Sequence, residues 1–101
     1  MARIDCFEPV GATVNLAVTS TTGRVARTLI GEDAAQVRIV NAGTVTVFLA
    51  FGGSSIDATT SGMPLLPGTA EVFTLTKEMT NIAAITASGT ATIYATTGRG
   101  A

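Results

Sequence analysis

Hydrophobic and polar residues alternate in short runs along this 101-residue chain, and glycine or proline separates the runs. In the segment 13–19, Val14, Leu16 and Val18 fall on one side of an extended backbone, and polar or small residues fall on the other. A period of two is typical of a strand with one face against a core. We predict seven such strands, at 13–19, 24–30, 36–41, 44–51, 70–76, 81–86 and 90–96.

The residue composition favours the same kind of structure. Threonine, valine and isoleucine make up about a third of the chain, and their β-branched side chains fit a pleated sheet surface. The segment 81–86 contains the run Ile-Ala-Ala-Ile, so it is expected to be covered on both faces. Only 31–35 offers a helical turn. The predicted fold is a single all-β domain, a β-sandwich or jelly-roll-like barrel of about seven short antiparallel strands.

A short connection, Asn41-Ala42-Gly43, separates the predicted strands at 36–41 and 44–51. Asparagine and glycine both tolerate positive φ, and such a connection between two alternating runs is typical of a hairpin. We therefore predict that these two strands pair with each other.

The segment 52–69 is long for a connection within a compact domain, and it is rich in glycine and proline. Residues 54–59 are a candidate short edge strand. Residues 63–67, Met-Pro-Leu-Leu-Pro, are apolar and stiffened by two prolines. This segment either plugs one end of the sandwich or contacts another subunit. Its candidate contact residues are Met63, Leu65 and Leu66.

The two ends of the chain differ in character. Residues 1–11 lack strand alternation but are too apolar to be well suited to free solvent, so we expect an N-terminal arm. The arm either lies on its own domain or reaches a partner, and its candidate contacts are Arg3, Ile4, Phe7 and Val10. The sandwich domain is expected to span 12–97, and 98–101 is expected to be a flexible tail.

The composition argues against common catalysis. The chain has no histidine, which removes the usual nucleophile pairs and histidine-bound metals. Glu32 and Asp33 are adjacent, so their side chains diverge on an extended backbone, and no phosphate-binding or calcium-binding motif occurs. We therefore expect no enzyme activity, no catalytic residue, no metal and no cofactor. Cys6 has no intrachain partner and is interpreted as a small apolar side chain rather than a reactive thiol.

Charge and hydropathy also bear on partners. Six Lys and Arg residues against seven Asp and Glu residues give a net charge of −1, which does not favour nucleic-acid binding. The longest apolar stretch, 45–51, is far shorter than the roughly 20 residues of a membrane-spanning helix. The first residues lack the apolar core of a secretory signal. We expect a product that folds where it is made, without membrane or nucleic-acid partners.

The predicted outward faces carry threonine and alanine instead of charged residues. In 90–96, Thr92, Tyr94 and Thr96 alternate with buried-type residues and are expected to face outward. Burying such a face against a neighbour removes little charge from water, so we expect self-association as a homo-oligomer. Tyr94 is either a rim residue or a weak aromatic platform for a ligand.

The order of strands and turns in 36–44, 47–52, 63–68, 71–75 and 82–95 resembles small β-sandwich virion proteins of tailed bacteriophages. These include capsid decoration, or cement, proteins. The resemblance implies a non-enzymatic virion component, made in the host cytoplasm, that binds the major capsid protein or other virion proteins and stabilises capsomer contacts. It implies no functional residues, because the group has no active-site motif to match. The alternative is a tail- or fibre-associated adhesion module that binds a host surface glycan.

Overall fold

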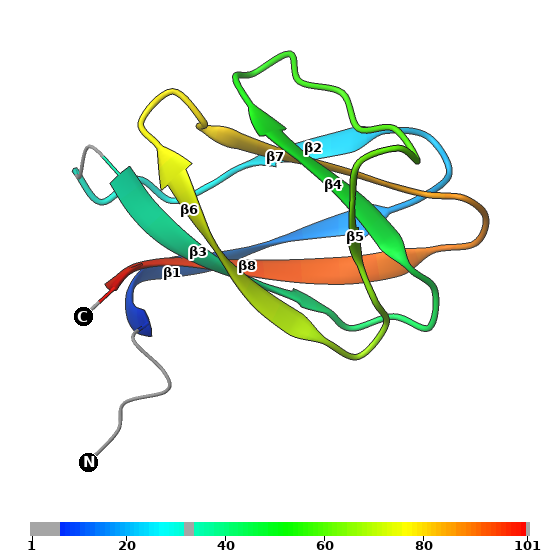
Figure 1. Ribbon diagram of the computed structural model, residues 1–101, viewed down its shortest axis with the longest axis horizontal. Coiled ribbons are helices and arrows are strands. Elements are labelled where there is room, and N and C mark those ends of the chain that lie inside the picture. Colours follow the sequence, from blue (N-terminus) through cyan, green and yellow to red (C-terminus); the bar gives the residue numbers. More distant parts are fainter. Residues whose placement is uncertain (1–6, 32–33, 101) are drawn as a thin grey trace.

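The fold consists of two four-stranded antiparallel sheets that face each other (Figure 1). The structure is a computed structural model that describes residues 7–31 and 34–100. One sheet has the order β1-β8-β3-β6 and the other has the order β2-β7-β4-β5. The strands are β1 (Phe7–Val18), β2 (Gly23–Ala26), β3 (Ala34–Asn41), β4 (Val47–Gly52), β5 (Met63–Leu65), β6 (Ala70–Thr76), β7 (Asn81–Thr86) and β8 (Ala91–Gly100).

The predicted all-β sandwich is confirmed, and the chain path has the strand order of a jelly roll. Nearly every connection leads from one sheet to the other, and β4 and β5 alone are consecutive strands that pair with each other in the part of the chain described. This connectivity places strands that are far apart in the sequence next to each other in a sheet, as with β1 and β8. The sheets form an open sandwich and do not close into a barrel.

The hairpin predicted between 36–41 and 44–51 is wrong. Strand β3 lies in one sheet and β4 in the other, so the intervening residues turn a corner between sheets. Gly43 does not have a positive φ; among the described residues, that conformation occurs at Gly31, Gly68 and Gly89. A Cβ atom at position 43 would lie 2.5 Å from the Cβ of Ala91, so this glycine is required by close packing against β8.

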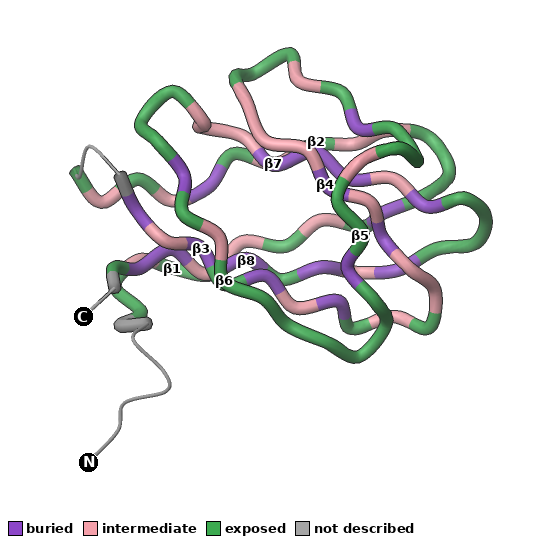
Figure 2. The backbone as a smooth tube through the Cα atoms, viewed as in Figure 1, coloured by how far each residue is buried: buried purple, intermediate pink, exposed green. Residues whose placement is uncertain are grey.

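The core lies between the two sheets and is made mainly by their central strands (Figure 2). It is aliphatic, as the alternation predicts. Its fully buried large side chains include Val37, Ile39, Val47, Leu49, Leu65, Leu75, Ile82 and Ile93. Phe51 and Phe73 pack beside it with ring centroids 5.1 Å apart.

Strand β7 is covered on both faces, which confirms the prediction for 81–86. Ile82, Ala83 and Ala84 have no exposed surface, and Ala83 alternates with Ile82 and Ala84, which belong to the core cluster between the sheets. The connection 53–62 provides the outer cover, because Ala58 N donates to Thr22 Oγ1 at 2.8 Å and holds this segment against the sheet. The candidate edge strand at 54–59 is therefore wrong: this segment crosses the outside of a sheet without joining its ladder.

The two ends of the described chain pair with each other. Strand β1 begins at Phe7, and Glu8 and Pro9 lie opposite Arg99 and Gly98 of β8. The part of the predicted arm from Phe7 onward, and residues 98–100 of the predicted tail, are thus strand. A register shift between Pro9 and Thr13 interrupts the alternation, which hid the strand from the sequence pattern. Residues 1–6, with Arg3 and Ile4, lie outside the described residues.

Candidate functional site

The candidate site is a surface of the sandwich. Within the described ranges, no three His, Cys, Asp or Glu side chains gather closely enough to hold a metal ion. The same part of the chain contains no helix with the length and apolarity needed to span a membrane.

The outward side of the β1-β8-β3-β6 sheet, called the outer face below, is a continuous field of small and weakly polar side chains. Its central row places Asn15, Tyr94, Val40 and Ala70 directly opposite one another on the four strands. Arg38 is the charged residue among the described side chains of these strands that point to this face. They include Thr13, Asn15, Ala17, Gln36, Arg38, Val40, Ala70, Val72, Thr74, Thr76, Thr92, Tyr94 and Thr96.

The prediction that Tyr94 faces outward is confirmed, since its side chain is 43% exposed. On this sheet Asn15 flanks it from β1 and Val40 flanks it from β3. Arg38 lies on the diagonal, since it pairs with Thr96 two residues further along β8. The phenol ring therefore has Asn15 on its β1 side, and on its β3 side it has Val40 directly opposite and Arg38 on the diagonal.

Several polar groups of the outer face already bond to one another. Thr13 Oγ1 and Thr96 Oγ1 lie 2.6 Å apart, and Gln36 Nε2 donates to Thr74 Oγ1 at 3.3 Å. Groups that are paired within the face keep those bonds when a partner covers it. The desolvation cost of docking is accordingly low compared with that of a charged face.

The predicted contact residues of 63–67 separate into two groups. Met63 is 48% exposed and Leu66 is 58% exposed, so both remain candidate contacts. Leu65 has no exposed surface and pairs with Val47 in the core, so its assignment as a contact residue is wrong. An extended backbone turns successive side chains to opposite sides, and Leu65 is the one turned inward.

At the N-terminal side, Val10 is 43% exposed on β1 and remains a candidate contact. Phe7 lies in β1 at the edge of the sheet. Two further exposed apolar residues, Leu29 and Val72, were not among the predicted contacts. The alternation in 70–76 gave a signal for Val72, because it places this residue on the side opposite Phe73 and Leu75.

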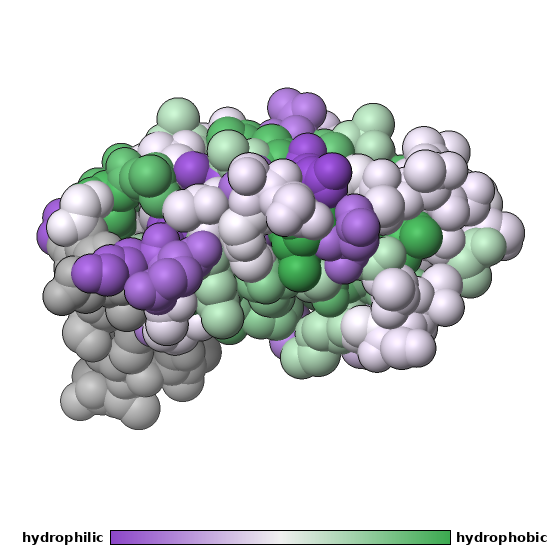
Figure 3. Space-filling model, turned by 90° about the horizontal axis from the view of Figure 1, so that it is seen from above, coloured by the Kyte–Doolittle hydropathy of each residue, from purple (hydrophilic) through white to green (hydrophobic). Residues whose placement is uncertain are grey.

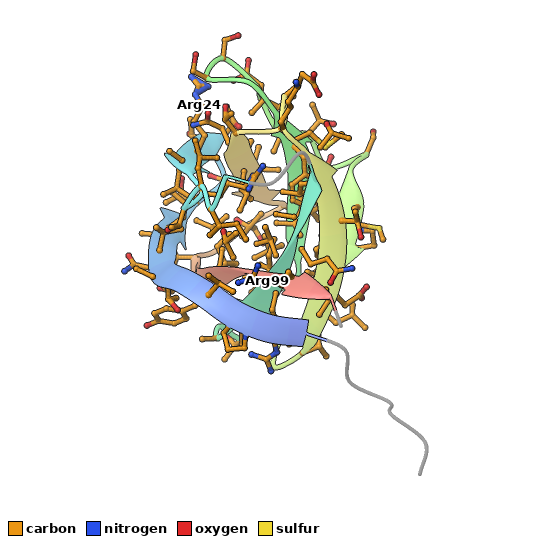
Figure 4. All side chains as sticks on the ribbon, turned by 90° about the vertical axis from the view of Figure 1, so that its left-hand side faces the viewer. Arg24 and Arg99 are labelled. Atoms are coloured by element: carbon orange, nitrogen blue, oxygen red, sulfur yellow. The ribbon has the colours of Figure 1, made fainter. Side chains whose placement is uncertain are left out.

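Strongly hydrophilic residues form small, separate groups on the molecule, as seen from above in Figure 3. Arg24 and Asp57 form an exposed ion pair, in which the Nη1 and Oδ1 atoms are 3.2 Å apart. Arg24 Nη1 also donates to Ile56 O at 2.9 Å, so this arginine fastens the 53–62 connection to β2 (Figure 4). Arg24 therefore has a structural role that the sequence pattern did not suggest.

Arg27 is a buried cation that fixes a turn. Its side chain is 4% exposed, and its Nε and Nη2 atoms donate to Met79 O and Thr76 O at 2.6 and 3.2 Å. Burial lowers the pKa of its guanidinium, because desolvation disfavours the charged form. The predicted strand 24–30 is accordingly shorter: it ends at Ala26, and Arg27 bonds to the last residue of β6 and to the connection that follows it.

The comparisons with known proteins bear on the fold. No protein-family model matches the chain, and no curated protein matches it. A solved structure of Bacillus endospore appendages, described as a novel family of disulfide-linked pili, is similar with a TM-score of 0.57. The two chains are 14% identical, and the match covers 94% of this chain and 88% of that one. At this identity the similarity supports the two-sheet fold alone.

Proposed function

We propose that this chain is a non-enzymatic structural subunit of a phage virion, a capsid decoration protein that binds the outer shell and stabilises contacts between capsomers. The observation that carries the proposal is the outer face, in which Arg38 is the charged member among the described side chains of four strands. A free-standing domain usually covers such a surface with charged side chains, whereas a face that docks on a neighbour benefits from their scarcity.

Two further observations support a role in assembly. Jelly-roll sandwiches recur in viral capsid domains, which agrees with the resemblance of the strand pattern to phage virion proteins. The similar structure is of endospore appendages that form disulfide-linked pili, and by analogy this favours a structural role. Fold similarity of this kind is an analogy and gives no residue roles. The partner under this proposal is the major capsid protein or another virion protein.

Binding to capsid shells tests the proposal. The purified chain should sediment with capsids of the phage that encodes it, and Tyr94→Glu should lower the occupancy about tenfold or more. The substituted carboxylate would have to lose its water at the centre of the outer face when the shell covers it, and the contacts of the tyrosine ring would be lost. Occupancy is measured by quantitative gel analysis of the pelleted capsids.

Thr60→Glu is the matched control, because Thr60 is exposed in the connection that covers the other sheet. It adds the same charge and should leave occupancy unchanged. Deleting residues 1–6 tests the predicted arm without shortening β1. Failure of the wild-type chain to bind capsids, or equal binding by Tyr94→Glu, contradicts docking through the outer face.

A second candidate function, a tail- or fibre-associated adhesion module, draws on the surroundings of Tyr94. An exposed aromatic ring next to Asn15 and Arg38 has the mix of stacking surface and hydrogen-bond donors that suits a sugar. A glycan array of host surface saccharides should then show binding by the wild-type chain that Tyr94→Phe retains and Tyr94→Ala loses. Binding that survives Tyr94→Ala, or no binding at all, counts against this function.

A further inference from the structure

The four edge strands of the sandwich differ in how open they are to pairing. Strand β2 has four residues, and β5 has three, one of which is Pro64. Strand β1 is long, but its register shifts next to Pro9 and Thr28 Oγ1 donates to Ala12 O from outside the sheet. Short strands, proline and bulges are features that discourage edge-to-edge pairing.

Strand β6 lacks these features. It has seven residues, contains no proline and pairs with β3 in an uninterrupted register from Ala70 to Thr76. Its threonine, valine and phenylalanine side chains favour a strand. In the described part of the chain no strand pairs with its other side, and all of its residues except Phe73 and Leu75 are exposed. Among the strands described, β6 therefore offers the longest regular free edge.

The hydrogen bonds next to β6 show which backbone groups point to that free edge. Asn41 N donates to Thr69 O at 2.9 Å, one position beyond the pair Val40 and Ala70. In an antiparallel ladder, alternate residues bond to the same neighbour. Residues 71, 73 and 75 therefore bond to β3, and the N–H and C=O groups of Val72 and Thr74 point outward.

We propose that this edge pairs antiparallel with β6 of a second copy of the chain, about a two-fold axis at Thr74, so that the two sheets become one continuous sheet. Each Thr74 then exchanges backbone hydrogen bonds with its counterpart. The same register, extended by one residue beyond the end of β6 at Thr76, places Glu71 opposite Lys77 of the second copy, twice by symmetry. Phe73 likewise lies opposite Leu75 of the second copy, which extends the core across the junction.

Charge selects this register. Glu71 and Lys77 are exposed, and neither forms an ion pair with another described residue. A register shifted to place the axis at Phe73 would put Glu71 opposite a leucine and Lys77 opposite Thr69, and both charge pairs would be lost. A two-fold contact of this kind is also closed, so it yields a dimer and not an open filament. The proposal deepens the structural-subunit function and rests on it.

Exchanging the charges of Glu71 and Lys77 in the full-length chain tests the proposed β6 contact. Sedimentation velocity over micromolar concentrations should show a dimer for the wild type. Glu71→Lys alone and Lys77→Glu alone should each weaken dimerisation about tenfold or more, because each change puts two pairs of like charges opposite each other. The double variant E71K/K77E should restore the dimer to near the wild-type affinity.

Glu78→Lys is the matched control, since this exposed carboxylate next to Lys77 makes the same charge change but has no charged partner in the proposed register. It should leave the dimer intact. A wild-type chain that sediments as a 10.2 kDa monomer, a single variant that dimerises normally, or a double variant that stays monomeric overturns the proposal.

Capsid binding distinguishes failure of the proposed β6 dimer from failure of the proposed decoration function. If Glu71→Lys is monomeric and still binds capsids, decoration does not require the β6 contact. If the wild type dimerises as proposed but does not bind capsids, the dimer contact stands and the decoration function is wrong.

Discussion

Asn41→Ala is expected to lower the free energy of unfolding by about 2–4 kcal/mol. The amide of Asn41 has no exposed surface and joins three segments of the chain. Its Nδ2 atom donates to Val45 O at 2.9 Å and to Leu65 O at 3.0 Å, and its Oδ1 atom accepts from Gly43 N at 2.9 Å. Alanine would leave these backbone groups without their partner, and water has poor access to them.

Urea unfolding followed by circular dichroism measures this loss. Asn15→Ala is the matched control, because Asn15 is exposed on the same sheet and its truncation should change stability by less than about 0.5 kcal/mol. Asn41→Asp distinguishes the acceptor role of the amide from its donor role. The substitution keeps an oxygen that accepts from Gly43 N, but it loses the Nδ2 donors and buries a carboxylate. A loss below about 1 kcal/mol for Asn41→Ala would show that these bonds do not hold the corner between the sheets.

The role of Asn41 explains why the sequence predicted its surroundings incorrectly. An asparagine close in sequence to a glycine is typical of a hairpin turn and also of a corner between sheets. Each of these two structures needs a compact local backbone. What decides between them here lies far along the chain. The side chain of Asn41 donates to Leu65 O. Ala91 packs so close to Gly43 that a Cβ atom at position 43 would not fit.

Local alternation was a better guide wherever one strand face meets the core. The outward position of Tyr94 and the double cover of 81–86 could both be predicted, since each follows from the side-chain pattern of a single strand. The openness of the β6 edge could not be predicted in this way. It depends on which strand ends each sheet, and that order is set by the pairing of strands distant in sequence.

The segment 63–67 shows the limit of alternation. Met63, Leu65 and Leu66 are all apolar and two prolines flank the leucines, so the pattern has no polar residue to mark the outward side. The structure resolves this by pairing β5 with β4, which turns Leu65 inward and leaves its neighbours exposed. The apolar segment 63–67, which the sequence pattern predicts as a single contact surface, is thus divided between the core and the surface.

Leu65→Ala should therefore destabilise the fold by about 2–5 kcal/mol, whereas Leu66→Ala should cost less than about 0.5 kcal/mol. Leu65 has no exposed surface, so truncation leaves a cavity beside Val47, while Leu66 is 58% exposed and loses few contacts. The two residues are adjacent and undergo the same chemical change, so the comparison measures mainly the difference in their burial.

Urea unfolding of the two variants gives the comparison directly, and the capsid assay adds a second readout. If 63–67 both supports the core and contacts a partner, Leu66→Ala weakens capsid binding without loss of stability. Leu65→Ala, in contrast, lowers stability first, and at temperatures where it remains folded it binds as well as the wild type. Equal and small stability losses for both variants would place the whole segment on the surface and remove β5 from the core.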